Sequence, residues 1–192
     1  MPKDRDQQTP DDVADARRLA ATRGSGTGGS GEDVLPGEPG APVGTISVTG
    51  VEFDDGDLLP DRYAHGGDNV SPALTWTGVP AGAKELVILC EDPDAPAGTF
   101  VHWVVTGIDP SATGVAEGTV PAGGLEGVNG FGEMGWGGPE PPVGDDAHRY
   151  VFTVLASSAA LDVGPAPDVD TVRTAMQGSE VGRGQLVALY QR

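Results

Sequence analysis

Short apolar runs separated by glycine and proline are the feature that most restricts the fold of this chain. The chain has 31 glycines and 17 prolines, and after residue 45 most of them fall between the apolar runs. The run Glu85–Cys90 is apolar on both faces, which is typical of a strand that is covered on two sides. The pattern predicts a mainly β protein, a two-sheet antiparallel β-sandwich with a few peripheral helices.

The alternation of apolar and polar residues places the individual elements. The alternation that begins at Ile46 slips at Gly50, as at a β-bulge. A single core helix is expected over Thr171–Gln177, with Asp170 as its N-cap and Gly178 after its end. The other expected strands are Leu74–Thr77, Glu85–Cys90, Phe100–Ile108, Tyr150–Leu155 and Gln185–Tyr190.

The first part of the chain has a different composition. Residues 1–41 are predicted to form a disordered or weakly helical tail, acidic and rich in glycine, and residues 42–192 the folded domain. Thr9 and Pro10 could begin a short helix that runs to Arg23, and Gly24–Gly31 reads as a flexible linker. A solubilising extension and a docking helix both remain open for this tail.

The charge of the chain limits its partners. Asp and Glu total 29 against 11 Lys and Arg, which gives a net charge of −18. Such a surface repels nucleic acid and anionic membranes, and an excess of carboxylates resembles proteins adapted to high salt. No apolar stretch reaches the roughly 18 residues of a membrane span, and the chain starts without the apolar region of a signal peptide. A cytoplasmic location is therefore expected.

Two histidines stand at the edges of expected strands, each beside an acidic, proline-rich loop. Asp92-Pro-Asp-Ala-Pro96 precedes Phe100–Val105, which contains His102, and Gly138–Val143 precedes His148. If the strands are neighbours, Asp92, His102 and His148 converge on one small pocket. Asp92 would then orient His102, both imidazoles would donate to an anion, and the amides around Gly138 would complete the cradle.

Strict alternation also predicts how the side chains of these strands point. His102 should lie on the face of Phe100 and Val104, opposite Trp103, and His148 should share a face with Tyr150. The glycine-rich segment Gly123–Gly138 lacks the pattern of a phosphate loop. Its two aromatic residues, Phe131 and Trp136, line the pocket rim or attach the loop to the core.

Other interpretations of the same residues remain open. A histidine beside aromatic residues is often only a packed core residue, and the single cysteine, Cys90, is either a small buried side chain or a nucleophile served by His102. A hydrolase with His102 or His148 as general base is thus an alternative, as is an interaction protein with a vestigial pocket. His65 and the other two histidines lack the spacing of metal ligands, so neither a metal nor a cofactor is expected.

Several separate motifs, in order, resemble the phosphatidylethanolamine-binding protein family, in particular its prokaryotic Raf-kinase-inhibitor-like branch. The resemblance runs from about Ile46 to the C-terminus. Its segments are Gly67–Trp76, Asp92–Pro96, Phe100–Val105, Gly127–Gly132, Gly138–Pro142 and His148–Tyr150.

The resemblance implies a β-sandwich with a pocket for phosphate or phosphoryl-type anions. Its pocket residues match Asp92, His102, Gly138 and His148, with Glu140 in the wall and Tyr150 nearby. Family members act as ligand-binding regulators and inhibitors of kinases or proteases, without a general catalytic activity; a homodimer is left open. Glu140 departs from the prokaryotic branch, which usually has cysteine there, and a carboxylate beside an anion site opposes binding unless it points outward or is protonated.

Overall fold

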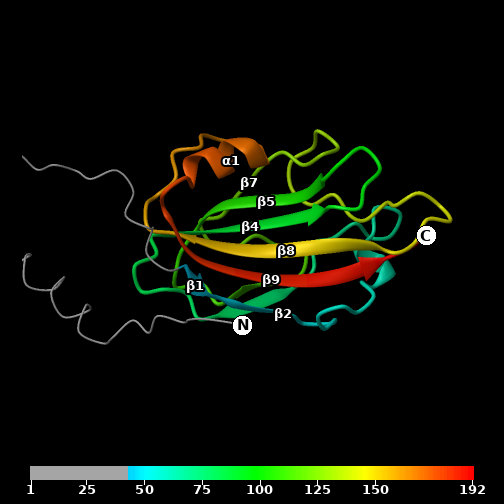
Figure 1. Ribbon diagram of the computed structural model, residues 1–192, viewed down its shortest axis with the longest axis horizontal. Helices are drawn as coiled ribbons and strands as arrows, with labels where there is room; N and C mark the ends of the chain where they lie inside the picture. The colour runs from blue at the N-terminus through cyan, green and yellow to red at the C-terminus, as the bar shows by residue number, and fades with distance from the viewer. Residues whose placement is uncertain (1–42) are drawn as a thin grey trace, which may run out of the picture. The chain divides into compact units, whose positions relative to one another are not determined.

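The computed structural model describes residues 43–192, which fold into two β-sheets and one helix (Figure 1). The large sheet has the strand order β1-β9-β8-β4-β5-β7 and the small sheet the order β2-β3-β6. In the large sheet the bounds are β1 Gly44–Thr45, β9 Glu180–Tyr190, β8 His148–Ser157, β4 Glu85–Asp92, β5 Phe100–Ile108 and β7 Leu125–Glu126. In the small sheet they are β2 Ser47–Gly50, β3 Leu74–Thr77 and β6 Gly114–Val115.

The predicted fold class is confirmed, with one exception to the antiparallel pairing. All the strand pairs are antiparallel except β1 with β9, which run parallel. The tail expected over residues 1–41 lies outside the described residues, and so does residue 42 of the expected domain. Within residues 43–192, no helix has both the length and the apolar character needed to cross a membrane.

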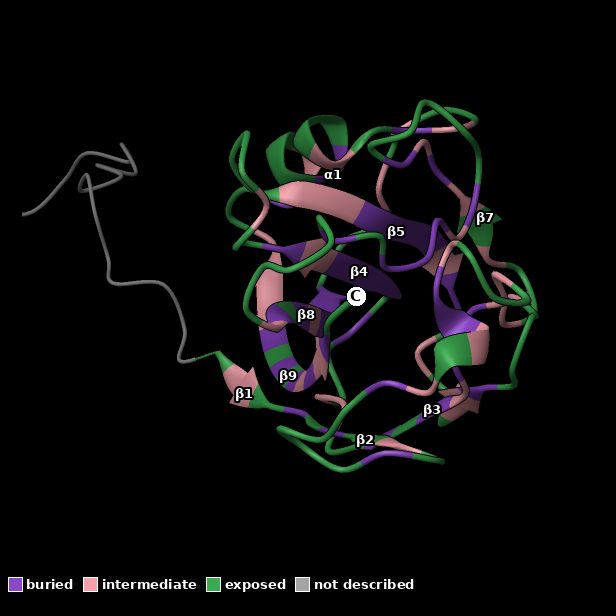
Figure 2. Cartoon of the chain, turned by 90° about the vertical axis from the view of Figure 1, so that its right-hand side faces the viewer, coloured by how far each residue is buried: buried purple, intermediate pink, exposed green. Residues whose placement is uncertain are grey.

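Strand β4 is apolar on both faces because it has a hydrophobic layer on each side. Leu86, Ile88 and Cys90 belong to the core between the two sheets, while Val87 and Leu89 pack in a second cluster with the helix. Figure 2 shows the buried residues of β4, β5 and β8 at the centre of the molecule. The central strands are thus held from both sides, and the ends of these strands form a rigid base for a site.

The helix α1, Val169–Ala175, begins two residues earlier than predicted. Asp168, and not Asp170, is the N-cap: its carboxylate accepts a hydrogen bond from the Thr171 amide at 2.8 Å. The earlier start brings Val169 into the helix, so that it joins Val172 against the large sheet. Both aspartates suit a cap by type, and packing decides between them.

Strand β9 begins at Glu180, five residues before the predicted Gln185 (185 − 180 = 5). Gly182 and Gly184 conceal this part of the strand in the sequence, because glycine carries no side chain to alternate. A Cβ at Gly184 would collide with the backbone of Ile46, and one at Gly182 would lie 2.8 Å from the ring of Pro80. These glycines let other segments cross close to the strand.

The predicted β-bulge at Gly50 is wrong, and a bulge occurs instead at His102. Strand β2 ends at Gly50, where the chain turns so closely that a Cβ would lie 2.5 Å from the Phe53 carbonyl oxygen. In β5, Trp103 pairs with Cys90 and Val101 with Glu91, so that His102 is the extra residue between them. The bulge disrupts strict alternation at the end of the sheet where the polar motifs lie.

Candidate ligand-binding site

A cavity of about 240 Å³ opens at the end of the large sheet where β4 stops and β5 and β8 start. It receives five of the six predicted ligand-binding residues, from three strands and one loop. The full lining is Asp92, Ala95, Pro96, Ala97, Gly98, Phe100, His102, Phe131, Glu140, Pro141, Pro142, His148 and Tyr150. Its walls are thus mainly apolar, with a few polar groups among them, which is the usual composition of a small-molecule site.

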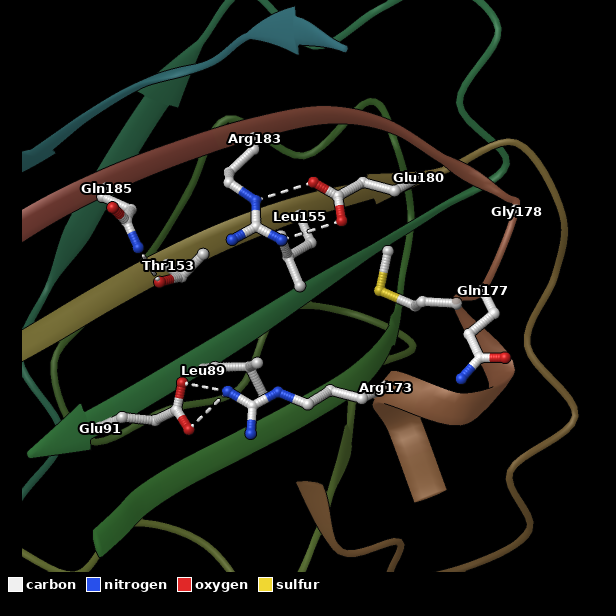
Figure 3. A pocket seen from close by; sticks show the side chains of 11 residues that line it. Leu89, Glu91, Thr153, Leu155, Arg173, Gln177, Gly178, Glu180, Arg183 and Gln185 are labelled. Carbon is white, nitrogen blue, oxygen red and sulfur yellow. Dashed lines mark hydrogen bonds and ion pairs between the residues drawn. The ribbon is translucent and has the colours of Figure 1, made fainter. Parts of the chain in front are cut away.

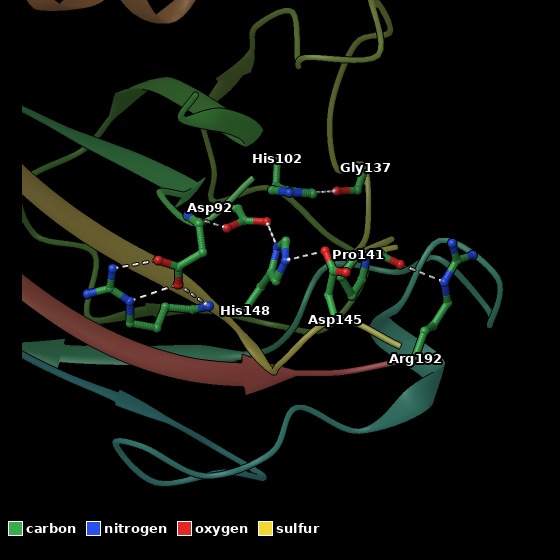
Figure 4. A network of polar contacts seen from close by, with 9 residues as sticks. Asp92, His102, Gly137, Pro141, Asp145, His148 and Arg192 are labelled. Atoms are coloured by element: carbon green, nitrogen blue, oxygen red, sulfur yellow. Dashed lines mark hydrogen bonds and ion pairs between the residues drawn. The ribbon is translucent and has the colours of Figure 1, made fainter. Parts of the chain in front are cut away.

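The carboxylate of Asp92 is bonded to His148 in the buried part of the site (Figure 4). Asp92 Oδ2 lies 2.8 Å from His148 Nδ1, and Asp92 Oδ1 accepts a hydrogen bond from the Asp94 amide at 2.8 Å. Asp92 and His148 are 3 % and 5 % exposed. The carboxylate only accepts, so it fixes the orientation of the imidazole with a proton on Nδ1.

The prediction that Asp92 orients His102 is wrong. His102 Nδ1 lies 2.5 Å from the carbonyl oxygen of Gly137, and since a carbonyl only accepts, Nδ1 must donate. The bulge explains the change of partner. It turns His102 away from the face of Val104, where alternation had placed it, and toward Tyr150, whose ring centre lies 5.0 Å away.

Burial keeps the pKa of His102 below its ordinary value of 6.5, against the opposing effects of Gly137 and Asp92. The unfolded chain then binds a proton near pH 6.5 that the folded chain binds only at lower pH, so the folded state loses stability as the pH falls below about 6.5. We expect His102→Gln to remove this contribution, at most about 1.4 kcal/mol per pH unit. Urea unfolding of both proteins at several pH values measures it, and equal slopes would contradict the assignment.

Tyr150 lines the cavity and has a buried hydroxyl without a hydrogen-bond partner among residues 43–192. The residue is completely buried, and its hydroxyl forms no hydrogen bond within residues 43–192. Desolvation and the nearby charge of Asp92 raise its pKa far above 10. The hydroxyl stays protonated, and its donor is unused among the described residues. His148 and Tyr150 share a face of β8, as predicted.

Gly138 does not line the cavity, in contrast to the prediction for its amide. Its N–H donates to Asn69 Oδ1 at 2.8 Å, so it is not free for an anion. A Cβ at this position would lie 2.6 Å from the Ala64 carbonyl carbon and from the His65 amide nitrogen. Gly138 therefore has a packing role: it lets the loop after Gly137 lie against the segment that contains His65.

Glu140 stands in the cavity wall with its charge already paired. Its Oε1 accepts a hydrogen bond from Arg192 Nη1 at 3.0 Å, and its Oε2 lies 3.9 Å from His65 Nε2. Arg192 also donates from Nε to the Pro141 carbonyl at 2.8 Å, which ties it to the same loop (Figure 4). The opposition of this carboxylate to an anion is thus reduced by a neighbouring cation.

Comparisons with known proteins show which family the chain belongs to. The family model for phosphatidylethanolamine-binding proteins matches residues 49–191. The chain belongs to this family. A UPF0098 protein of Methanothermobacter thermautotrophicus is 41 % identical over 145 residues, which cover 73 % of this chain and 95 % of that protein. A UPF0098 protein of Aquifex aeolicus is 39 % identical over 152 residues, or 77 % of this chain and 89 % of that protein.

A solved structure shows the same fold. The crystal structure of Escherichia coli YbcL, described as a new member of the mammalian family of these proteins, superimposes with a TM-score of 0.72. The match has 29 % sequence identity and covers 77 % of this chain and 98 % of that chain. The two-sheet architecture described above is therefore that of the phosphatidylethanolamine-binding protein family.

Three residues that support the cavity were not among the predicted site residues. Asn69, with φ of 54°, holds Gly138 as described. Asn129 accepts hydrogen bonds from the amides of Phe131 and Glu133 at 2.9 and 3.2 Å, which shapes the loop that carries Phe131. His65 stacks on Phe131 with ring centres 4.8 Å apart. Both asparagines lie in segments of the family resemblance, which was the signal for them.

The two aromatic residues of the glycine-rich loop divide the roles that the sequence left open. Phe131 lines the cavity. Trp136 attaches the loop to the core, since it stacks on Phe152 and donates from Nε1 to the Tyr63 carbonyl at 3.0 Å. The loop is thus anchored by one ring and presents the other to the cavity.

Cys90 does not have the surroundings of a nucleophile. It is 0 % exposed within the core between the sheets, and burial raises its pKa well above the ordinary value. A buried thiol with a raised pKa stays protonated and unreactive. Within residues 43–192, the side chains of His, Cys, Asp and Glu form no group of three or more that could hold a metal ion.

A larger cavity, about 450 Å³, lies on the outer face of the large sheet beside α1 (Figure 3). Its charged groups are paired with one another. Arg173 contacts both oxygens of Glu91 at 2.8 Å, and Arg183 forms two hydrogen bonds with Glu180 at 2.7 and 2.9 Å. Because its arginines already have carboxylate partners, this cavity offers no free charge to a ligand.

Proposed function

We propose that the chain is a non-enzymatic, ligand-binding regulatory protein whose 240 Å³ cavity takes a phosphate or another phosphoryl-type anion. One observation carries the proposal. Two imidazoles from different strands meet at one cavity, and each has its Nδ1 fixed by an oxygen acceptor, Gly137 O for His102 and Asp92 Oδ2 for His148. Each ring is thereby held in place through Nδ1, and Nε2 is the nitrogen that would meet a ligand; Asp145 Oδ2 lies 3.8 Å from that of His148.

The surroundings of the imidazoles favour binding over hydrolysis. Among residues 43–192, the two rings form hydrogen bonds or ion pairs with the Gly137 carbonyl and the carboxylates of Asp92 and Asp145. No hydroxyl or thiol nucleophile lies within hydrogen-bond distance of either ring in this part of the chain, and Cys90 is buried away from solvent. A hydrolase would have to activate water alone, for which no further group of the site is specialised.

Calorimetric titration with inorganic phosphate and with phosphoethanolamine tests the proposal. We expect wild type to bind, and His102→Ala and His148→Ala to lose most of the affinity, because each removes one ring nitrogen from the cavity. Gln177→Ala is the control, since Gln177 is exposed in the separate cavity beside α1 and does not contact the site. Unchanged binding in both pocket variants would contradict the assignment of the cavity.

A protein partner extends the proposal, since the family resemblance implies regulation of a kinase or a protease. Such a partner should respond to the state of the pocket. A pull-down with wild type and with His148→Ala, with and without phosphate, measures this response. If the amount of captured partner changes neither with the substitution nor with phosphate, the result would favour an interaction protein whose pocket plays no part in partner binding.

The charge of Glu140 gives a prediction for affinity. Glu140→Gln should raise the affinity for phosphate by about threefold, because one negative charge leaves the cavity wall, and the effect stays small because Glu140 is paired and partly exposed. Arg192→Ala should lower the affinity, because it leaves the carboxylate without its cation. Titration of both variants at low ionic strength checks the two opposite signs, and shifts in the same direction would refute the electrostatic explanation.

A further inference from the structure

We propose that the cavity takes up protons together with its anion, so that ligand binding responds to pH; this inference rests on the proposed function. The argument begins with where the imidazole protons are. His102 must carry a proton on Nδ1, because that atom bonds to the Gly137 carbonyl oxygen, which only accepts. His148 likewise directs Nδ1 to the carboxylate of Asp92 at 2.8 Å.

A neutral imidazole with its proton on Nδ1 has only a lone pair on Nε2. Such a nitrogen accepts a hydrogen bond but cannot donate one, and it repels the oxygen of an unprotonated anion. Each ring can therefore donate to an anion only after Nε2 gains a proton. The proton comes from solvent, or it stays on a protonated ligand whose O–H donates to Nε2; in both cases binding strengthens as the pH falls.

The surroundings of His102 indicate that its ring gains the second proton only when an anion binds. The ring is 3 % exposed and contacts Phe100, Phe131 and Tyr150, so the free cavity holds it in the neutral form. Burial among these aromatic groups, the lowered pKa and the donation to Gly137 all agree. An anion in the cavity would supply the opposite charge that the imidazolium lacks.

The surroundings of His148 differ, because two carboxylates face it. Asp92 from β4 bonds to Nδ1, and Asp145 Oδ2 from the preceding loop lies 3.8 Å from Nε2. The other titratable and charged groups at the cavity are Tyr150 of β8 and Glu140 of the wall with its partners Arg192 and His65. Outside the cavity, Asp94 after β4 pairs with Arg149 of β8. His102 is the ring without a bonded carboxylate, and it accounts for about one proton per bound anion.

Sulfate is the probe with which proton uptake by the protein alone can be measured, because sulfate itself carries no proton near neutral pH. Titration of wild type with sulfate at about pH 7.5, above the ordinary histidine pKa, in two buffers of different ionisation enthalpy gives the number of protons taken up. We expect about one proton or more per sulfate, and an affinity that rises about tenfold for each unit of pH decrease per proton. Equal heats in the two buffers and an affinity independent of pH would overturn the inference.

His102→Gln tests which group takes the proton. A glutamine amide donates without first being protonated, so this variant should bind sulfate at about pH 7.5 with about one proton fewer than wild type. Gln177→Ala is the control, because Gln177 is exposed in the separate cavity beside α1, and it should keep the uptake of wild type. If His102→Gln binds with undiminished proton uptake, His102 is not the group; if this variant does not fold, the buffer dependence of wild type still decides.

The two proposals fail in different ways. Anion binding without proton uptake would contradict only the inference on protons. Absence of both sulfate and phosphate binding over the whole range in which the protein is folded would contradict the proposed function, and the inference with it. The chain has only three histidines, so their ring resonances in NMR can be followed individually and show whether the His102 resonances shift to the imidazolium form when sulfate is added.

Discussion

Replacing Asp92 with alanine should weaken phosphate binding by about 30-fold or more and destabilise the fold by about 3 kcal/mol. The side chain is buried, and its two oxygens serve two partners, His148 Nδ1 and the Asp94 amide, each at 2.8 Å. Without the carboxylate, His148 loses the acceptor that fixes its orientation and the proton on Nδ1. An anion would then meet a ring that is no longer held in place.

Isothermal calorimetry and urea unfolding measure the two effects separately. Asp94→Ala is the matched control, because Asp94 lies in the same loop and pairs with Arg149 at 2.7 Å, but this pair is largely exposed. Exposed ion pairs are worth about 1 kcal/mol or less, so the control should bind phosphate nearly as wild type does. If Asp92→Ala were to bind as tightly as this control, the Asp92–His148 pair would have no part in binding.

The sequence predicted which residues meet at the cavity more accurately than how they are bonded. Asp92 and His102 stand at strand ends, and antiparallel neighbours bring strand ends together, so alternation and turn signals were enough to group them with His148. Asp92 bonds to His148 and not to His102, and His102 is the extra residue of a bulge in β5. A bulge leaves no mark in a pattern of apolar and polar residues, because it arises from the fit of two strands to one another.

The sequence also did not predict contacts between segments that are far apart in the chain. The role of Gly138 depends on Asn69 and on the backbone of Ala64, about seventy residues before it. A glycine at this position indicates a turn or a close approach of another backbone segment, but it does not show which segment that is. The same holds for Glu140, whose pairing with Arg192 joins a loop to the far end of β9 and determines how strongly the carboxylate opposes an anion.

Replacing Gly138 with alanine should destabilise the fold by roughly 3 kcal/mol, at the upper end of what overpacking costs. The added Cβ would meet the backbone of three consecutive residues, including the Ala64 carbonyl carbon at 2.6 Å. Backbone cannot rotate away as a flexible side chain can, so the loop or the facing segment must move. Urea unfolding measures the loss, and Gly66→Ala is the control, since a Cβ there meets nothing within 4 Å.

Gly138→Ala should also lower the affinity for the ligand, through its effect on the position of His102. Gly137, the residue before Gly138, supplies the carbonyl oxygen that holds His102 Nδ1 at 2.5 Å, and Pro139 after it accepts a hydrogen bond from the His65 amide at 3.0 Å. A displacement of the loop would lengthen the bond to His102 and release the ring that the bulge turns into the cavity. We therefore expect Gly138→Ala to lower phosphate affinity even in solutions where the variant is fully folded. Affinity equal to that of Gly66→Ala, measured by calorimetry under those conditions, would show that the Gly137 carbonyl is not what holds His102 in the binding position.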